Sequence, residues 1–338
     1  MLGHHGEDML RAFRFQDNRL VADDIDPSHE PDANVAPVWL DLMSPTPDED
    51  RFVERLTGIS IPTREEMQEI EFSSRLFSES GAEYMTVVAA VQLDTDQPML
   101  TPITFALKGN NLVTVRHADP KSFPLFIGRV QKPGTIACQT GELIMLGILE
   151  AMVDRAADAL ERVGVEIDGI SHEVFQSKAA KASVRSQNLR SIILQIGRKG
   201  ELLGIMREAL VSFYRMLTYH SASEGEEKKG RQLARARLKT LHRDISSLSD
   251  HADSLTSKIN FLLDATLGLI NLEQNQIIKI FSVAAVVFLP PTLVASIYGM
   301  NFHHMPELGL RFGYPVALLL MAVSAVVPYL FFKRRGWL

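Results

Sequence analysis

Two long apolar runs, residues 277–297 and 314–332, stand out near the C-terminal end of the chain. Each has about the 20 residues that a helix needs to cross the ~30 Å hydrocarbon layer of a membrane. Between residues 280 and 332 the only formal charges are Glu307 and Arg311. The alternative is a pair of buried core helices, but core helices of this length normally carry a polar face, and these runs carry none. The pattern therefore predicts two membrane spans joined by a short polar loop.

The basic residues after the second run indicate how the spans are oriented. Lys333, Arg334 and Arg335 follow it directly, and basic segments beside a span face the cytoplasm. With two spans the N-terminus lies on the same side, which agrees with the absence of a signal-peptide pattern over residues 1–14. The loop, residues 298–313, is therefore expected to face outward.

Upstream of the spans, residues 1–135 alternate between strand-like and helix-like patterns. Thr46 and Thr63 each begin a capping box, in which a threonine precedes a helix and an acid follows three residues later. Asp119 before Pro120 is expected to cap another helix, and residues 109–111 form a hairpin turn. Runs rich in Val, Thr, Phe and Tyr predict strands near residues 9–15, 38–42, 75–78, 84–93, 103–107 and 111–116.

From residue 141 to Pro290 there is no proline, and strand patterns disappear. Breaks near residues 177–183 and 221–230 divide this helical part into three pieces. The third, from residue 228 to 297, is about 70 residues and, at 1.5 Å per residue, about 105 Å long. A helix of this length is expected to form a stalk that packs on neighbouring helices or on copies of itself. The alternative is a solvated coiled-coil spacer with no further role.

The predicted fold class is an α+β cytoplasmic domain with a long helical stalk and two transmembrane α-helices. The domain boundaries follow from the same patterns. We expect a cytoplasmic α/β domain at 1–135, a long-helix region at 136–276, a transmembrane domain at 277–333 and a basic cytoplasmic C-terminus at 333–338.

Composition and missing motifs narrow the function. The net charge of −6 argues against a general nucleic-acid binder, and the lone Cys138 fits a reducing compartment. There is no Gly-rich phosphate loop and no convincing dinucleotide fingerprint, so we expect no nucleotide cofactor. A short hairpin between two spans is a poor place for an enzyme site and a good place for the mouth of a pore. His303 and His304 are adjacent, a poor geometry for chelating one ion, which favours an ordinary loop pair.

Polar and small residues repeat along one face of the first span and the helix before it. Steps of three, four and seven residues keep them on one side of a helix. The set is Asp264, Asn275, Ile278, Phe281, Ala285, Leu289, Thr292, Ser296 and Gly299. One pair of spans cannot enclose a pore, so a pore needs this face repeated around a symmetry axis. Asn301 would then form a ring of amide oxygens, and Phe281 and Leu289 would form apolar collars. Close packing in a membrane dimer explains the same spacing equally well.

Two further features accompany the first span. Pro290 and Pro291 remove backbone donors and are expected to kink or loosen the helix locally. Lys279 lies at its cytoplasmic end and, with the basic residues at 333–335, forms either a basic collar at the inner end of a pore or an anchor to lipid headgroups.

The sequence around the loop resembles the CorA family of divalent-cation channels. The resemblance is carried by Tyr298–Gly299–Met300–Asn301, by Met305–Pro306–Glu307–Leu308, and by the flanking runs 271–275 and 312–315. It implies a funnel-shaped homopentamer in the inner membrane, with the first span lining the pore. It also implies that the Gly-Met-Asn turn binds hydrated Mg²⁺, an ion that loses its water reluctantly.

The same resemblance implies how the channel is driven and closed. A divalent ion gains roughly 4.6 kcal/mol per 100 mV of membrane potential, so no ATP is needed. Cytoplasmic Mg²⁺ held between acidic residues of neighbouring subunits would keep the channel closed. Asp244, Asp250 and Asp253 are candidate ligands, although a solvated helix face explains each of them as well.

Co²⁺ and Ni²⁺ are expected as secondary substrates. The alternatives are a zinc-transporting homologue, for which the imidazoles of the loop are suited, and a two-span membrane scaffold or sensor that conducts nothing.

Overall fold

The structure, a computed structural model, describes residues 10–23, 25–27, 37–95, 97–134, 137–176, 182–223, 232–301, 305–309 and 311–337. The chain divides into two compact units. The first joins Met1–His172 with Gln195–Phe261, and the second joins Glu173–Leu194 with Leu262–Leu338.

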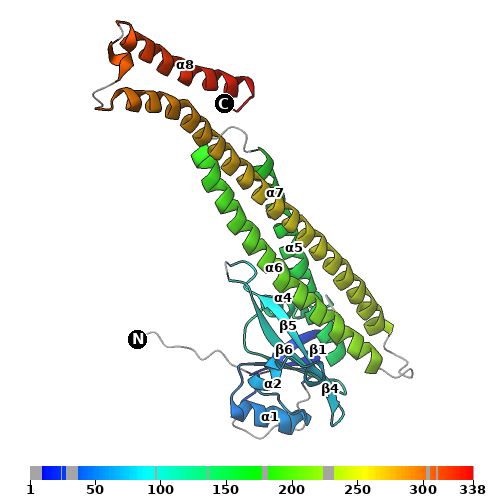
Figure 1. The fold of residues 1–338 in the computed structure, drawn as a ribbon. Coiled ribbons are helices and arrows are strands. Elements are labelled where there is room, and N and C mark those ends of the chain that lie inside the picture. Colours follow the sequence, from blue (N-terminus) through cyan, green and yellow to red (C-terminus); the bar gives the residue numbers. More distant parts are fainter. Residues whose placement is uncertain are drawn as a thin grey trace, which may run out of the picture. The chain divides into compact units, whose positions relative to one another are not determined.

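A seven-stranded sheet organises the first unit (Figure 1). Its strand order is β2-β1-β3-β7-β6-β5-β4, and every neighbouring pair is antiparallel except β3 with β7. The strands are β1 (Leu10–Gln16), β2 (Arg19–Asp23), β3 (Trp39–Met43), β4 (Leu76–Glu79), β5 (Ala82–Val91), β6 (Met99–Lys108) and β7 (Asn111–Arg116). The mixed α/β pattern expected for this part of the chain is confirmed.

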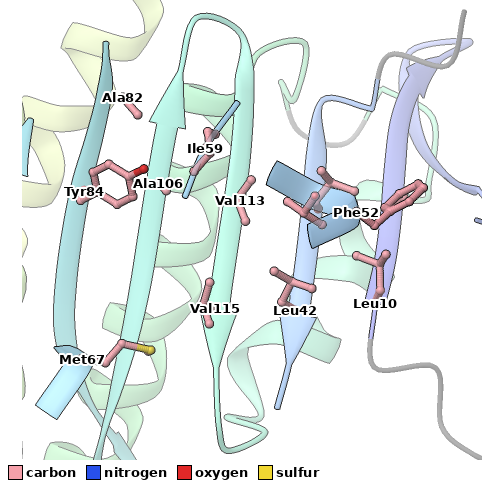
Figure 2. Packing of buried hydrophobic residues seen from close by; sticks show 13 residues of the cluster. Leu10, Leu42, Phe52, Ile59, Met67, Ala82, Tyr84, Ala106, Val113 and Val115 are labelled. Carbon is pink, nitrogen blue, oxygen red and sulfur yellow. The ribbon is translucent and has the colours of Figure 1, made fainter. Parts of the chain in front are cut away.

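The central strands are buried on both faces of the sheet, as strands covered on two sides must be. On one face, Leu42 and Val115 belong to a core cluster that also includes Phe52 of helix α1 (Pro47–Thr57) and Met67 of helix α2 (Arg64–Gln68), all labelled in Figure 2. On the other face, Trp39 is fully buried and stacks on Phe13 with ring centroids 4.6 Å apart. Strand residues therefore alternate between two cores rather than between core and solvent.

Local sequence signals set most boundaries in this unit. Both capping boxes are confirmed: Thr46 and Thr63 accept from the backbone N–H three residues on, and Glu49 and Glu66 bond back to the caps. Gly109 takes a φ of 61° in the hairpin between β6 and β7, as the turn prediction requires.

Three details of the sheet domain differ from expectation. β2 was not predicted, since its five residues carry little apolar pattern of their own and depend on pairing with β1. A short helix, α3 (Phe72–Arg75), precedes β4. The expected cap at Asp119 is wrong: helix α4 (Ser122–Val130) begins after Lys121 without a side-chain cap. The physical reason is that the Asp119 carboxylate accepts a 2.6 Å bond from the buried Arg116 instead.

The long helices end close to where the sequence breaks were expected. They are α5 (Gly141–Gln176), α6 (Ala182–Ser223), α7 (Gln232–Tyr298) and α8 (Gly313–Arg334), with a 3₁₀ turn, η1 (Pro306–Gly309), before α8. α7 runs for 67 residues, and Pro290 and Pro291 do not end it. Each proline removes an N–H, so the carbonyls of Val286 and Val287 lose their helical donors.

Within the first unit, α5, α6 and α7 are held together by a shared core and by ion pairs. Buried residues on α7 recur at steps of three, four and seven, at Ala234, Leu238, Leu241, Ile245, Ala252, Leu255 and Ile259. Lys258 of α7 pairs with Asp168 of α5, and Arg207 of α6 pairs with Asp253 of α7 at 2.9 Å. This part of α7 therefore packs on helices of its own chain, in agreement with the stalk prediction rather than with an isolated solvated helix.

Candidate ion pathway

Among the described residues, two helices are long and apolar enough to cross a membrane, α7 and α8, and the C-terminal part of α7 and the whole of α8 lie in the second unit. Large apolar side chains are exposed along both: Phe281 is 72% exposed, Leu289 65% and Leu319 65%. A soluble protein would bury such residues, because exposing contiguous apolar surface to water is unfavourable. The exposure argues against the core-helix alternative and supports two membrane spans.

The face of α7 expected to line a pore lies uncovered within a single chain. Every residue of that face, from Asp264 to Gly299, is exposed. The more protected residues of the same span follow a separate stripe at steps of three and four, at Val283, Val287, Pro290, Val294 and Tyr298. The two stripes are offset by about two residues, or about 200° around the helix. The polar and small face therefore points away from the stripe that its own chain protects.

Helix α8 carries a matching protected stripe, at Gly313, Ala317, Met321, Ser324, Pro328 and Phe332. After the loop, α8 turns back and brings Trp337 beside Lys279 of α7, with the Lys279 Nζ 5.9 Å from the ring centroid. The rest of α8 is apolar and exposed, as expected for a helix that faces lipid. Within the described part of the chain, α8 leaves the pore-type face of α7 open.

The Gly-Met-Asn turn ends α7 directly. The N–H of Gly299 donates to the Ala295 carbonyl at 2.9 Å, and that of Met300 donates to Ile297 at 3.3 Å. A Cβ on Gly299 would lie 3.1 Å from the Ala295 oxygen, which is tighter than an ordinary contact. Asn301 follows outside the helix and is exposed. Its side chain bonds to no other residue in the part of the chain that the structure describes.

The rest of the loop is described only in part. Met305 and the backbone of η1, including Pro306, are present, whereas the side chains of Glu307 and Leu308 lie outside the description. His303 and His304 also lie outside the described residues. The predictions for these four side chains therefore stay predictions.

The polar groups of the span differ in how they are satisfied. Thr292 donates its hydroxyl to the Phe288 carbonyl at 2.7 Å, the usual back-bond of a threonine in a membrane helix. This bond leaves the Thr292 oxygen able to accept a further hydrogen bond. Asn275 and Ser296 are exposed on the same face.

The basic residues at the other end of the spans lie over aromatic rings. Lys333 Nζ is 6.0 Å from the Tyr329 centroid, and the Arg335 guanidinium is 5.4 Å from the Phe331 centroid. Arg334 is exposed. Lys279 and the C-terminal residues are thus brought to one end of the unit, as the prediction of a basic collar or an anchor requires.

The three candidate regulatory acids do not gather in one chain. Asp253 is bound to Arg207, Asp244 lies 3.9 Å from the neighbouring Arg243, and Asp250 is exposed. Among the described residues, no group of three His, Cys, Asp or Glu side chains is placed to hold a metal. A site between subunits would draw ligands from two chains, so these residues remain candidates only.

The structure also contains buried charges that sequence reasoning missed. His220 of α6 lies between Glu83 of β5 (2.8 Å) and Glu142 of α5 (3.5 Å), and Arg116 pairs with Asp41 at 2.9 Å, both about 1% exposed. No local signal marks them, because the partners are far apart in sequence.

Comparison with known proteins gives a consistent result. Residues 35–334 match the family described as "CorA-like Mg2+ transporter protein". The chain is 36% identical over 330 residues to the "Magnesium transport protein CorA" of Pasteurella multocida and 35% identical to that of Escherichia coli K12, covering 98% of this chain and 100% of each relative. Its fold is similar to "The complete structure of CorA magnesium transporter from Methanocaldococcus jannaschii", with a TM-score of 0.75, 18% identity and coverage of 98% and 99% of the two chains.

Proposed function

The chain belongs to the CorA family of Mg²⁺ transporters, and from this membership we propose that it carries Mg²⁺ across a membrane as its substrate. The observation that carries the proposal is the alignment with two bacterial magnesium transport proteins, which covers essentially the whole of each chain. Spans, loop and soluble part are therefore all shared with those relatives. Transport, rather than an enzymatic reaction, is the activity that this membership supports.

We propose a homopentamer, as the family resemblance implies, with the exposed face of α7 turned inward around a shared axis. Two features support this arrangement. A pair of spans cannot enclose a pore alone, and the face that carries Asn275, Thr292 and Ser296 has no cover from the described part of its own chain. Polar side chains facing lipid would be costly, so a second copy or a water-filled axis is the favourable environment for them.

At the outer end, Asn301 is the proposed ligand for the hydrated ion. Its amide oxygens, repeated around the axis, accept hydrogen bonds from the inner water shell of Mg²⁺. Retaining that shell avoids the large dehydration cost of this small ion. Gly299 lets α7 end in this turn without a Cβ that would crowd the Ala295 carbonyl, and Met300 completes the turn.

Farther along α7, Leu289 and Phe281 are the proposed apolar collars, which close the path by excluding water. Asp264 would lie near the cytoplasmic mouth, where a carboxylate attracts the cation. Lys279 with Lys333, Arg334 and Arg335 forms the basic collar or lipid anchor at the same end. The membrane potential supplies the inward drive, roughly 4.6 kcal/mol per divalent ion at 100 mV.

The remaining parts of the proposal concern regulation, cellular location and membrane orientation. We propose that cytoplasmic Mg²⁺, bound between subunits near Asp244, Asp250 or Asp253, favours the closed state. Both termini would lie in the cytoplasm and the loop 298–313 outside, in the inner membrane. The boundaries at 135, 276 and 333 divide the proposed sensing, stalk and conducting parts.

Uptake into proteoliposomes tests the function directly. Purified protein is reconstituted with a Mg²⁺-sensitive dye inside and an imposed inside-negative potential. We expect Mg²⁺ uptake, smaller uptake of Co²⁺ and Ni²⁺, and near-complete loss of Mg²⁺ uptake in Asn301→Ala. Gln276→Ala, which removes an exposed α7 amide outside the proposed pore face, is the matched control and should transport normally.

Three results would contradict parts of this proposal. Uptake of Zn²⁺ without Mg²⁺ would favour the zinc-transporting alternative. No uptake of any cation by a well-folded pentamer would favour a scaffold or sensor. Normal uptake by Asn301→Ala would remove the amide ring as the selective site while leaving transport itself intact.

A further inference from the structure

A cluster of three cations surrounds one carboxylate just beyond the end of strand β5 in the first unit. Asp94, in the turn after β5, is bonded by Lys121 at 2.8 Å, by Arg155 of α5 at 2.9 Å and by Arg162, about two turns farther along α5. The bonds from Lys121 and Arg162 are the largest cause that holds the pKa of Asp94 well below its usual range. Asp94 is therefore a fixed anion at neutral pH.

The cluster has more positive charge and more donors than Asp94 uses. Three cations and one carboxylate leave a net charge of about +2 at this point. Each arginine has five N–H donors and lysine has three, yet each side chain bonds Asp94 through a single nitrogen. Asp119, the other acid beside the cluster, is bound by Arg116 at 2.6 Å. The remaining N–H groups of Lys121, Arg155 and Arg162 therefore bond to no other carboxylate among the described residues.

Beside the cluster is a cavity of about 200 Å³ with an apolar floor. Met152, Ala156, Met206 and Phe213 come from α5 and α6, while Lys121 and Arg155 stand at its polar side. Drug-sized ligands occupy pockets of about 300–1,000 Å³, so this cavity suits one ring-sized group. The methionines can adjust to the shape of such a group because their side chains are flexible.

One wall of the cavity is held in an uncommon backbone conformation. Gln92, which lines the cavity, has a φ of 57°, a left-handed value that non-glycine residues adopt rarely. Such residues are found preferentially at ligand clamps and functional turns. Gln92 is the first residue of the turn that places Asp94 beside the three cations. The Thr95 N–H donates to the Gln92 carbonyl at 2.9 Å and closes this turn.

We propose that this cavity binds a phosphate monoester, with its phosphate on Lys121 and Arg155 and its apolar ring over Met152, Met206 and Phe213. The charge of the cluster matches a phosphate dianion, and arginine offers the forked donors that phosphate prefers. The site is formed by the sheet and two helices of one chain. It is independent of the ion pathway, and its occupancy does not depend on the proposed transport function.

Isothermal titration of the purified full-length protein tests the site, in Mg²⁺-free buffer at low salt because salt screens exposed charges. Phenyl phosphate is the probe, inorganic phosphate lacks the ring, and phenol lacks the phosphate. We expect saturable one-to-one binding of phenyl phosphate, weaker binding of inorganic phosphate and none of phenol. AMP is a second monoester. Tighter binding of AMP than of phenyl phosphate would identify a nucleoside as the organic part of the ligand, and weaker binding would identify a smaller organic group.

Matched variants separate the site from general surface charge. Lys121→Gln and Arg155→Gln each remove a charged donor and should weaken phenyl phosphate binding by about tenfold or more. Arg129→Gln removes a comparable exposed charge from α4 and should have no effect. Ala156→Leu narrows the cavity and should weaken phenyl phosphate but not inorganic phosphate, whose binding also reports that the variant is folded.

Three outcomes would overturn the proposal. Equal binding of phenyl phosphate and inorganic phosphate would mean that the apolar cavity takes no part. Absence of binding by both monoesters, or binding unchanged in Lys121→Gln and Arg155→Gln, would mean that the cluster is only an internal salt-bridge network. Mg²⁺ uptake is measured in parallel on the same protein. Normal uptake together with any of these results would show that the phosphate site fails while the transport proposal stands.

Discussion

Replacing His220 with glutamine should abolish a pH dependence of stability in the sheet domain. His220 is about 1% exposed, and its Nδ1 lies 2.8 Å from Glu83 while its Nε2 lies 3.5 Å from Glu142. Burial by itself lowers the pKa of the imidazole. The hydrogen bond with Glu83 and the charges of both carboxylates outweigh burial and raise the pKa to about 9. At neutral pH the folded state therefore holds an imidazolium between β5 and α5.

The magnitude follows from linkage between protonation and folding. The folded pKa of about 9 lies above the unfolded value of about 6.5. The stabilisation is therefore fully present below pH 6.5 and is lost as the pH rises through 9. Between pH 7 and pH 10 the loss is on the order of 2–3 kcal/mol. For a domain of this size each kcal/mol moves Tm by roughly 2–4 °C, so Tm should fall by roughly 5–10 °C.

Tryptophan fluorescence provides the assay. The chain has two tryptophans, and a Trp337→Phe background leaves Trp39, which is buried against Phe13 in the sheet domain, as the reporter. Thermal unfolding in detergent is followed from pH 6 to pH 10 for this background and for His220→Gln in it. The difference between the two curves removes the contribution of other groups that titrate.

The expected difference curve falls through pH 9. His251→Gln, which removes an exposed imidazole from α7, should follow the background curve. If His220→Gln lost stability with pH as steeply as the background, the charged imidazole would not be the cause, and the reasoning would be refuted.

Three further predictions concern the ion path and the sheet. Gly299→Ala should reduce Mg²⁺ uptake, because its Cβ would lie 3.1 Å from the Ala295 oxygen and the turn would have to shift by a few tenths of an ångström; normal uptake in proteoliposomes would show that the turn tolerates this shift. Asp41→Ala should lower stability by up to about 3–5 kcal/mol, since it removes the buried partner of Arg116 and leaves the exposed Asp119 as the remaining carboxylate bound to it. The exposed-pair control Asp48→Ala should cost under about 1 kcal/mol, and similar Tm losses in the two variants would contradict this ranking. Limited proteolysis should show greater protection of the cytoplasmic part in millimolar-range Mg²⁺ than in chelator, and identical digests would argue against closure by the ion.

Much of the architecture could be predicted from the sequence because it depends on local signals. The capping boxes at Thr46 and Thr63 need only residues three apart, and both formed as expected. The two apolar runs became helices of spanning length because backbone groups in lipid must bond within their own segment. The motif around Asn301 is equally local, and it led to the family that the full-length comparisons support.

Other features were decided only by the tertiary structure. Asp119 did not cap α4, because the buried Arg116 bound its carboxylate instead. The charged groups around His220 and Asp94 come from segments that are distant in sequence, and the fold alone brings them together. A buried charge is stable only when specific partners surround it, and no pattern along the chain records which partners those will be. The face of α7 shows the same division. Its spacing could be read from the sequence, whereas its exposure on the side away from its own chain required the folded structure.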